Sequence, residues 1–134
     1  MRKYFLAYLL LVGSFSVFSA AADVTKPEVV YYGFDPDIVT NYIAADRRTM
    51  GYIRVVVELM LDNKIHLSTI EHHEPLILDT IIGTISQQPE EKVKSLLGRE
   101  EIRLNILQKL QQKMQDETGN TMIRDILFTK YLYQ

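Results

Sequence analysis

Apolar and polar positions alternate most regularly between Met50 and Leu61. Successive side chains of a strand point to opposite faces of a sheet, so this period of two predicts a β-strand. One face of the predicted strand is wholly apolar and consists of Ile53, Val55, Val57, Leu59 and Leu61. The opposite face is mixed, because Arg54 and Glu58 lie on it. A mixed face is typical of a sheet that helices cover on one side only.

Three other segments are rich in residues that favour strands. The first two are residues 29–32 and 38–43, and the turn-forming residues 35–37 lie between them. We expect both to form short or edge strands. The third segment, residues 123–133, is expected to return to the sheet as its last strand.

From Ser68 onward the apolar residues recur at a helical spacing, which predicts helices. The first apolar stripe consists of Ile70, Ile77, Ile81 and Ile85, broadened by Leu78 and Ile82. Pro75 lacks an amide donor and clashes with a preceding helical turn, so we expect it to begin or kink this helix. It would separate a short lead-in from a main segment over residues 76–86.

A further helix start is indicated by Pro89 and the two glutamates after it, because proline suits the first helical position and carboxylates suit the positive end of the helix dipole. Gly98 is expected to interrupt this helix. The longest helix is predicted over residues 99–116, and its apolar stripe consists of Ile102, Ile106, Leu110 and Met114, with Leu107 beside it. Gly119 is expected to end it, because glycine readily adopts the left-handed conformation of helix ends.

These elements follow one another in the order ββ(β)ααβ and predict an α+β fold. We expect a small sheet of three to four strands packed on two to three helices, without an internal repeat or a second domain. A chain of 134 residues has room for one such domain. Its size suffices for a core that needs neither a metal ion nor a disulfide bond.

The N-terminal residues 1–22 have the features of an export segment. Met1, Arg2 and Lys3 form a basic start, and the run over residues 4–22 carries no charge. As a helix, this run is just long enough to span a hydrocarbon core about 30 Å thick. Its second half is less apolar, and residues 20–22 are the small alanines that a signal peptidase accepts. A cleaved signal peptide and a retained membrane anchor are therefore both open.

Either alternative keeps the basic start in the cytoplasm and exports the rest of the chain. We therefore divide the chain into a signal peptide or membrane anchor at residues 1–22, a short linker at 23–30 and a domain at 31–134. The expected location is the bacterial inner membrane facing the periplasm. If the leader is cleaved near Ala22, the location is the soluble periplasm instead.

Charge and composition argue against several classes of function. The 15 Lys and Arg residues oppose 17 Asp and Glu residues, giving a formal net charge of -2, and both signs are interspersed along the chain. We therefore expect no nucleic-acid partner. The chain contains no cysteine, so thiolate metal ligands and thiol nucleophiles are excluded.

Three histidines are the candidates for metal binding. His66 and His73 are seven positions apart and would share a face of one helix, with His72 beside them and Glu71 or Glu74 as a third ligand. The neighbouring proline disturbs that geometry. Exposed histidines at the start of a helix are the favoured interpretation, and we expect no metal.

The acidic pairs Glu90-Glu91 and Glu100-Glu101 could be taken for acid/base groups. Adjacent side chains on a helix do not face each other, so we interpret both pairs as helix-start charges. The sequence also has no glycine-rich phosphate loop and no GxSxG motif. We expect no catalytic residue, no cofactor and no small-molecule substrate.

Two surfaces are candidates for binding another protein. One is the mixed face of the long strand, with Tyr52, Arg54 and Glu58. The other is the apolar helix face with Ile77, Ile81 and Ile85. We interpret the helix face first as part of the core, with an interface to a partner helix or to a ring as the alternative.

Four separated blocks of the chain carry a resemblance to a known family. They are residues 32–41, with the turn Asp35-Pro36 and Asn41; residues 51–59; residues 75–82 together with 98–103; and residues 126–134, with Phe128, Thr129 and Gln134. In their order and spacing, these blocks are similar to the periplasmic domain of the FliL family of flagellar basal body-associated proteins.

The resemblance implies a fold similar to the stomatin-type membrane-scaffold domain, homo-oligomers that form rings, and contact with stator units and basal-body ring proteins. It also implies non-enzymatic support of the motor from the periplasmic side of the inner membrane. Family members usually have a longer linker than residues 23–30, which suggests a divergent or secondary member. A different hypothesis is a soluble periplasmic module that binds a small ligand or lipid between sheet and helices.

Overall fold

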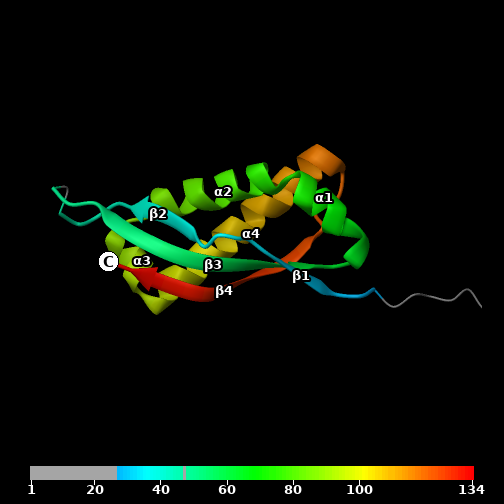
Figure 1. Ribbon diagram of the computed structural model, residues 1–134. Coiled ribbons are helices and arrows are strands. Elements are labelled where there is room, and N and C mark those ends of the chain that lie inside the picture. The colour runs from blue at the N-terminus through cyan, green and yellow to red at the C-terminus, as the bar shows by residue number, and fades with distance from the viewer. Residues whose placement is uncertain (1–26, 47) are drawn as a thin grey trace, which may run out of the picture.

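The structure, a computed structural model, describes residues 27–46 and 48–134 (Figure 1). The leader expected at residues 1–22 lies outside the described residues, so its boundary and its fate stay predictions. Within the described part of the chain, no helix is both long enough and apolar enough to cross a membrane.

The sheet has four antiparallel strands, which are β1 (Val30–Gly33), β2 (Ile38–Tyr42), β3 (Gly51–Leu61) and β4 (Ile123–Tyr133). The long strand β3 is central, and β4 pairs with one of its edges. Strands β1 and β2 share the other edge: Val30 pairs with Leu61 and Ile38 with Val55. All four predicted strand segments are thereby confirmed.

The regular pairing of β3 is interrupted on both of its edges at the same position along the strand, opposite Val56 and Val57. On one edge, residues 34–37 separate β1 from β2 opposite these two residues. On the other edge, the register shifts between Val56 and Val57, and Thr129 is the extra residue of β4. Extra residues of this kind bend a strand and increase its twist. The level of Val56 therefore divides the sheet into two halves.

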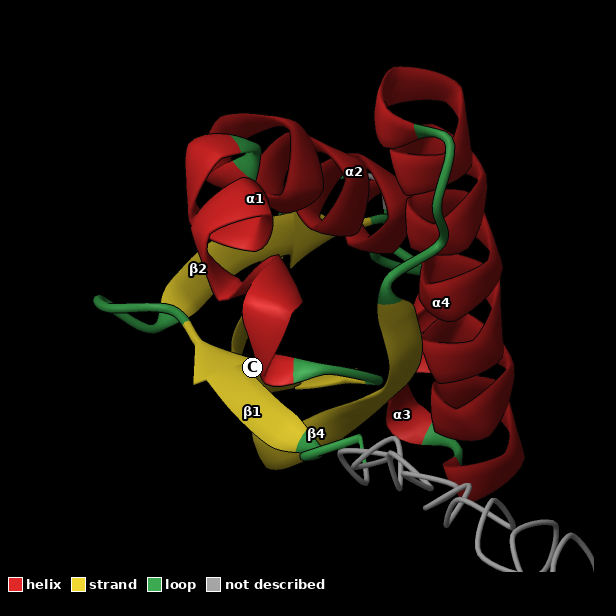
Figure 2. Ribbon diagram, turned by 90° about the vertical axis from the view of Figure 1, so that its right-hand side faces the viewer, coloured by secondary structure: helices red, strands yellow, loops and turns green. Residues whose placement is uncertain are grey.

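The helical part comprises the 3-10 turn η1 (Lys64–His66) and the helices α1 (Leu67–His72), α2 (Glu74–Ser86), α3 (Glu90–Lys94) and α4 (Leu96–Thr118). Helices α2 and α4 lie on the same side of the curved sheet (Figure 2). The prediction of a sheet covered on one side is confirmed. The expected two to three helices were too few, because α1 and α3 are too short to show a helical period in the sequence.

The core lies between the inner face of the sheet and the helices. Its largest fully buried side chains come from β3, α1, α2, α4 and β4: Ile53, Leu59, Leu61, Ile70, Ile77, Ile81, Ile85, Ile102, Ile106, Leu110, Met114 and Ile123. The alternation of β3 is complete, since its odd-numbered residues are buried and its even-numbered ones are partly or fully exposed. The main positions of both predicted helix stripes belong to this core, whereas Ile82, expected to broaden the first stripe, is 38% exposed.

The break between α3 and α4 lies at Ser95 and not at Gly98. Ser95 has an extended backbone, and its hydroxyl oxygen accepts a hydrogen bond from the Gly98 amide at 2.9 Å. This is an N-terminal helix cap. Gly98 is buried in the first turn of α4, where a Cβ would collide with the carbonyl oxygen of Lys92. A side chain at this position would collide with α3, so only glycine fits. The prediction that Gly98 interrupts a helix was therefore wrong.

Two other predicted helix signals, at Pro75 and Gly119, are confirmed. Pro75 lies in the first turn of α2 and follows the short helix α1. Gly119 ends α4 with a φ of 79°, in the left-handed conformation. Its amide donates to the carbonyl of Gln115 at 2.9 Å, which satisfies one of the free carbonyls of the helix end.

Candidate interaction surface

The outer face of the sheet is open to solvent near Arg54, a residue of β3. The strand register places Val39 of β2 and Leu132 of β4 on either side of Arg54. Val39 is 55% exposed, Leu132 57% and the nearby Tyr52 50%. We call the surface formed by Val39, Tyr52, Arg54 and Leu132 the Arg54 face.

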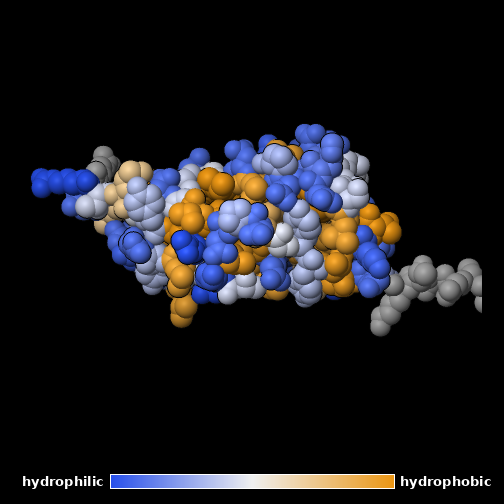
Figure 3. Space-filling model, in the orientation of Figure 1, coloured by the Kyte–Doolittle hydropathy of each residue, from blue (hydrophilic) through white to orange (hydrophobic). Residues whose placement is uncertain are grey.

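Two open hollows meet at the Arg54 face and share Val39 and Arg54. One has a volume of about 410 Å³ and also involves Tyr52, Leu132 and Gln134. The other has a volume of about 420 Å³ and is completed by the turn at residues 35–37. On the face of the molecule seen in Figure 3, apolar residues reach the surface among polar ones. The Arg54 face therefore joins two hollows through a single cationic side chain.

The charges on the outer face differ between its two halves. Lys130 and Asp37 form an ion pair of 2.9 Å at the level of Val56. Among the ion pairs between described residues, none includes Arg54. Glu58, the third predicted residue of this face, is partly buried on the far side of Val56. The structure thus places Tyr52 and Arg54 together and Glu58 apart from them.

The positions that carry the family resemblance surround the same face. Asp35 and Pro36 line one hollow, and Gln134 lines the other. Asn41 pairs with Tyr52. The carbonyl oxygen of Gln134 accepts a hydrogen bond of 2.5 Å from the buried Tyr42 hydroxyl, and its amide donates to Tyr52 at 2.9 Å.

The last two of these positions lie at the bend of the sheet. Phe128 pairs with Val57, and Thr129 is the extra residue beside it. The alternation of apolar and polar residues in β3 predicted that Tyr52 and Arg54 share a face. It did not predict that Val39 and Leu132 lie beside Arg54, because that contact depends on how the strands pair.

The predicted helix face with Ile77, Ile81 and Ile85 is not a surface of this fold. Each of the three side chains is at most 1% exposed and belongs to the core. The inner face of the sheet covers them, so the interpretation as core holds and the interface alternative does not.

The three histidines take separate roles. His66 Nε2 lies 3.2 Å from Asp62 Oδ1, and His73 Nδ1 lies 2.8 Å from the carbonyl oxygen of Thr69. His72 is exposed. Across residues 27–46 and 48–134, no three His, Cys, Asp or Glu side chains gather as metal ligands would. His66 and His73 bind to different parts of the protein and do not converge.

The acidic pairs differ from each other. Glu90 lies in the first turn of α3, as expected, and accepts a hydrogen bond of 2.7 Å from the Ala45 amide. A hydrogen bond from Lys94 lowers the pKa of Glu90. Glu100 lies beyond the first turn of α4, so its interpretation as a helix-start charge was wrong. It pairs with Arg103 at 2.6 Å instead, and this hydrogen bond lowers the pKa of Glu100.

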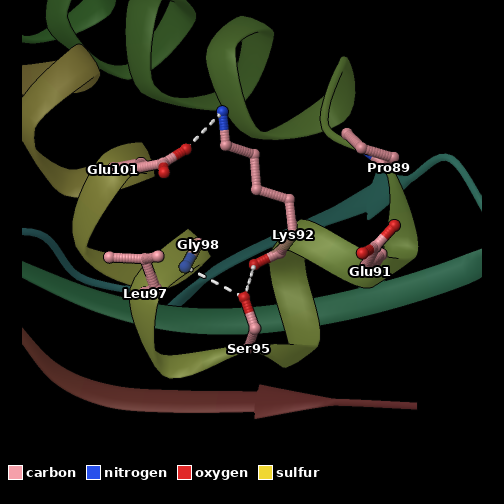
Figure 4. Close-up of a pocket in the computed structure, with 7 residues that line it drawn as sticks. All are labelled: Pro89, Glu91, Lys92, Ser95, Leu97, Gly98 and Glu101. Atoms are coloured by element: carbon pink, nitrogen blue, oxygen red, sulfur yellow. Dashed lines mark hydrogen bonds and ion pairs between the residues drawn. The ribbon is translucent and has the colours of Figure 1, made fainter.

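A further hollow of about 290 Å³ lies at the junction of α3 and α4 (Figure 4). Lys92 spans it and forms an ion pair with Glu101 at 2.9 Å. Ser95 caps α4 beside it, and Leu97 on its rim is exposed. The polar groups drawn together here join the two helices to each other, which is a structural role.

Two tyrosines tie the sheet to the helices. Tyr32 of β1 donates a hydrogen bond to the carboxylate of Glu74 at the start of α2. This bond is the largest cause that raises the pKa of Tyr32 to about 12. Tyr131 of β4 donates to the carbonyl of Val93 at 2.9 Å, and burial raises its pKa to about 12.

The described structure is thus a small α+β protein with a one-sided sheet, whose outer face is open to solvent near Arg54. Residues 31–134 match the family of the flagellar basal body-associated protein FliL. A protein named "Flagellar protein FliL" from Aquifex aeolicus (strain VF5) is 30% identical over 115 residues, which cover 85% of this chain and 68% of that protein. The chain belongs to the FliL family of flagellar basal body-associated proteins, and the predicted family is confirmed.

Proposed function

We propose that this chain supports the flagellar motor from the periplasmic side of the inner membrane, by binding stator units and basal-body ring proteins and without catalysing a reaction. The observation that carries the proposal is the family match over residues 31–134, which includes all the helices and nearly the whole sheet. A protein that only binds can still regulate a machine. It stabilises the assembled state if it binds that state more tightly than the free components.

The one-sided sheet supports a binding role. Helices cover its inner face. On the Arg54 face, by contrast, the side chains of Val39, Leu132 and Tyr52 are each at least half exposed. Exposed apolar groups of this kind contribute binding free energy when a partner covers them. The same chain is expected to form homo-oligomers, which sedimentation of the purified protein would measure.

The export segment expected at residues 1–22 supports the periplasmic location. Its fate decides whether the protein stays at the membrane or diffuses. Mass spectrometry of the protein recovered from the cell envelope would give its N-terminus. A start near residue 23 means a cleaved signal peptide, and an intact start means a retained anchor.

Deletion of the gene in its own bacterium tests the function. We expect slower swimming or swarming with flagella still assembled, restored by the full-length chain supplied from a second locus. The restored strain controls for effects on neighbouring genes. Unchanged motility at every medium viscosity would overturn the proposal.

The competing hypothesis places a small ligand or a lipid between sheet and helices. In the described structure that space is occupied by fully buried side chains, among them Leu59, Ile81 and Ile106. Three hollows among the described residues lie on the outer face of the sheet or at a helix junction. The close packing of side chains between sheet and helices therefore favours the binding role over a ligand carrier.

A further inference from the structure

We propose that the Arg54 face binds an amphipathic helix of a flagellar partner protein, and that this helix carries one Asp or Glu in its apolar stripe, opposite Arg54. This inference rests on the proposed function and deepens it, because it states which surface is used and what chemistry the partner's contact has.

The charge of Arg54 determines the partner's chemistry. Arg54 lies between the exposed side chains of Val39 and Leu132, and no ion pair among the described residues includes it. A purely apolar partner would cover the guanidinium and leave it without an acceptor, which is unfavourable. A carboxylate satisfies it, because two of its oxygens match the fork of guanidinium donors.

The dimensions of the face fit a helix. From Val39 across β3 to Leu132 the surface spans two strand spacings of about 4.8 Å each. The total of about 10 Å equals the diameter of an α-helix with its side chains. The hollow lined by Val39, Tyr52 and Leu132 can receive an apolar side chain of such a helix. Binding would give the open side of the sheet the helical layer that its inner side already has.

Neighbouring charges restrict where the helix can lie. Toward the other half of the sheet, the ion pair between Lys130 and Asp37 crosses the outer face. Asp35, which lines the hollow beside Arg54, would repel a carboxylate placed over that hollow. The partner's acidic residue is thereby restricted to the position over Arg54. Like-charge repulsion of this kind fixes the register of an interface.

Photocross-linking in the living bacterium tests the inference with the full-length chain. The variant Tyr52→p-benzoylphenylalanine puts the cross-linker on the Arg54 face. Leu104→p-benzoylphenylalanine is the matched control, because Leu104 is 49% exposed but lies on α4, in the helical layer. We expect the Tyr52 variant, and not the Leu104 variant, to cross-link a flagellar protein within an amphipathic helical segment that contains Asp or Glu among its apolar positions.

Charge reversal then tests the ion pair itself. Adding Arg54→Glu to the Tyr52 variant should lower the cross-linking yield about tenfold or more. Replacing the partner's acidic residue by Arg should restore the yield in the Arg54→Glu background. Thermal unfolding of both variants checks that they fold, and Arg54→Gln carries the same test if Arg54→Glu does not.

Three results would overturn the inference. The first is a yield that Arg54→Glu and Arg54→Gln leave unchanged. The second is cross-linking to lipid or to a second copy of this chain instead of a partner helix. The third is the absence of any product specific to Tyr52. If deletion of the gene still impairs swimming in these cases, the proposed function stands and only the assignment of the surface fails.

Discussion

The two faces of the sheet differ in how far their side chains are buried. On the inner face of β3, every second residue is buried against helices, with Leu59 at 0% exposure. On the outer face, Tyr52 is half exposed and Leu132 of the neighbouring strand is 57% exposed. Burial of apolar area stabilises the fold, so the inner face supplies stability. The outer face near Arg54 buries less apolar area and is therefore expected to contribute less to folding.

Two leucines on opposite faces give the largest test of this comparison. Leu59→Ala leaves a cavity in the core and should lower the free energy of unfolding by about 2–5 kcal/mol. Leu132→Ala should change it by no more than about 0.5 kcal/mol, because the side chain is mostly in solvent. Urea unfolding of the purified variants followed by circular dichroism measures both. Equal losses would mean that the outer face is part of the core.

Two helical glycines sharpen the comparison within the helical layer. Gly98→Ala would place a Cβ against the backbone of α3 and should cost about 1–3 kcal/mol. Gly83→Ala in α2 meets nothing within 4 Å and should stabilise by about 0.5–1 kcal/mol, since alanine favours helix. Thermal unfolding of the two variants separates the effects. If Gly98→Ala left the thermal stability unchanged, α3 and α4 could move apart at Gly98 with little loss of stability.

Adjacent tyrosines of β1 point to opposite faces and provide a pH test. Tyr32→Phe removes the hydrogen bond to Glu74 and should cost about 1 kcal/mol, whereas Tyr31→Phe on the exposed face should cost nothing measurable. The pKa of Tyr32 is raised to about 12 in the folded state from 10.0. Its contribution is therefore full below pH 10 and lost as the pH rises toward 12.

Measuring urea unfolding at pH 8 and at several values above pH 10 checks this order. The stability difference between the wild type and Tyr32→Phe should shrink as the pH rises through that range. A difference that stays constant would show that the phenol of Tyr32 does not control the contact with Glu74.

The smallest expected effect concerns the ion pairs at the surface of α4. The pKa of Glu100 is lowered because it accepts hydrogen bonds from Arg103, so its contribution is present above the unfolded value of 4.5 and lost as the pH falls. Glu100→Gln should flatten the loss of stability below pH 4.5. Glu117→Gln, on the same helix and outside the ion pairs of the described chain, is the control. Acid titrations of the variants should show the flatter slope only for Glu100→Gln.

The sequence predicted helices and strands correctly where the residues adjacent in the chain determine the local structure. The period of two in β3 correctly separated Val55 and Leu59 from Arg54, because alternation is a property of the strand itself. Gly119 ended α4 as expected, since a left-handed residue there follows from backbone geometry.

Features that depend on distant segments could not be read in this way. Gly98 looked like a helix breaker, because only the folded chain shows that α3 passes beside it. The candidate site was predicted in part for the same reason. Arg54 and Tyr52 were found through their strand, while Val39 and Leu132 join them through pairing with β2 and β4.

The shared edge of β3 has a mechanical consequence. The described chain begins beside β1, at the end of the molecule opposite the end of β4 (Figure 1). Arg54 lies seven residues before Leu61, which at about 3.3 Å per residue is on the order of 20 Å along the strand. If a partner holds Arg54 while Pro27 is pulled away from it, β1 is drawn lengthwise along β3. Antiparallel hydrogen bonds run across that direction, so the pairs from Val30 to Gly33 share the load in shear rather than peeling apart one after another.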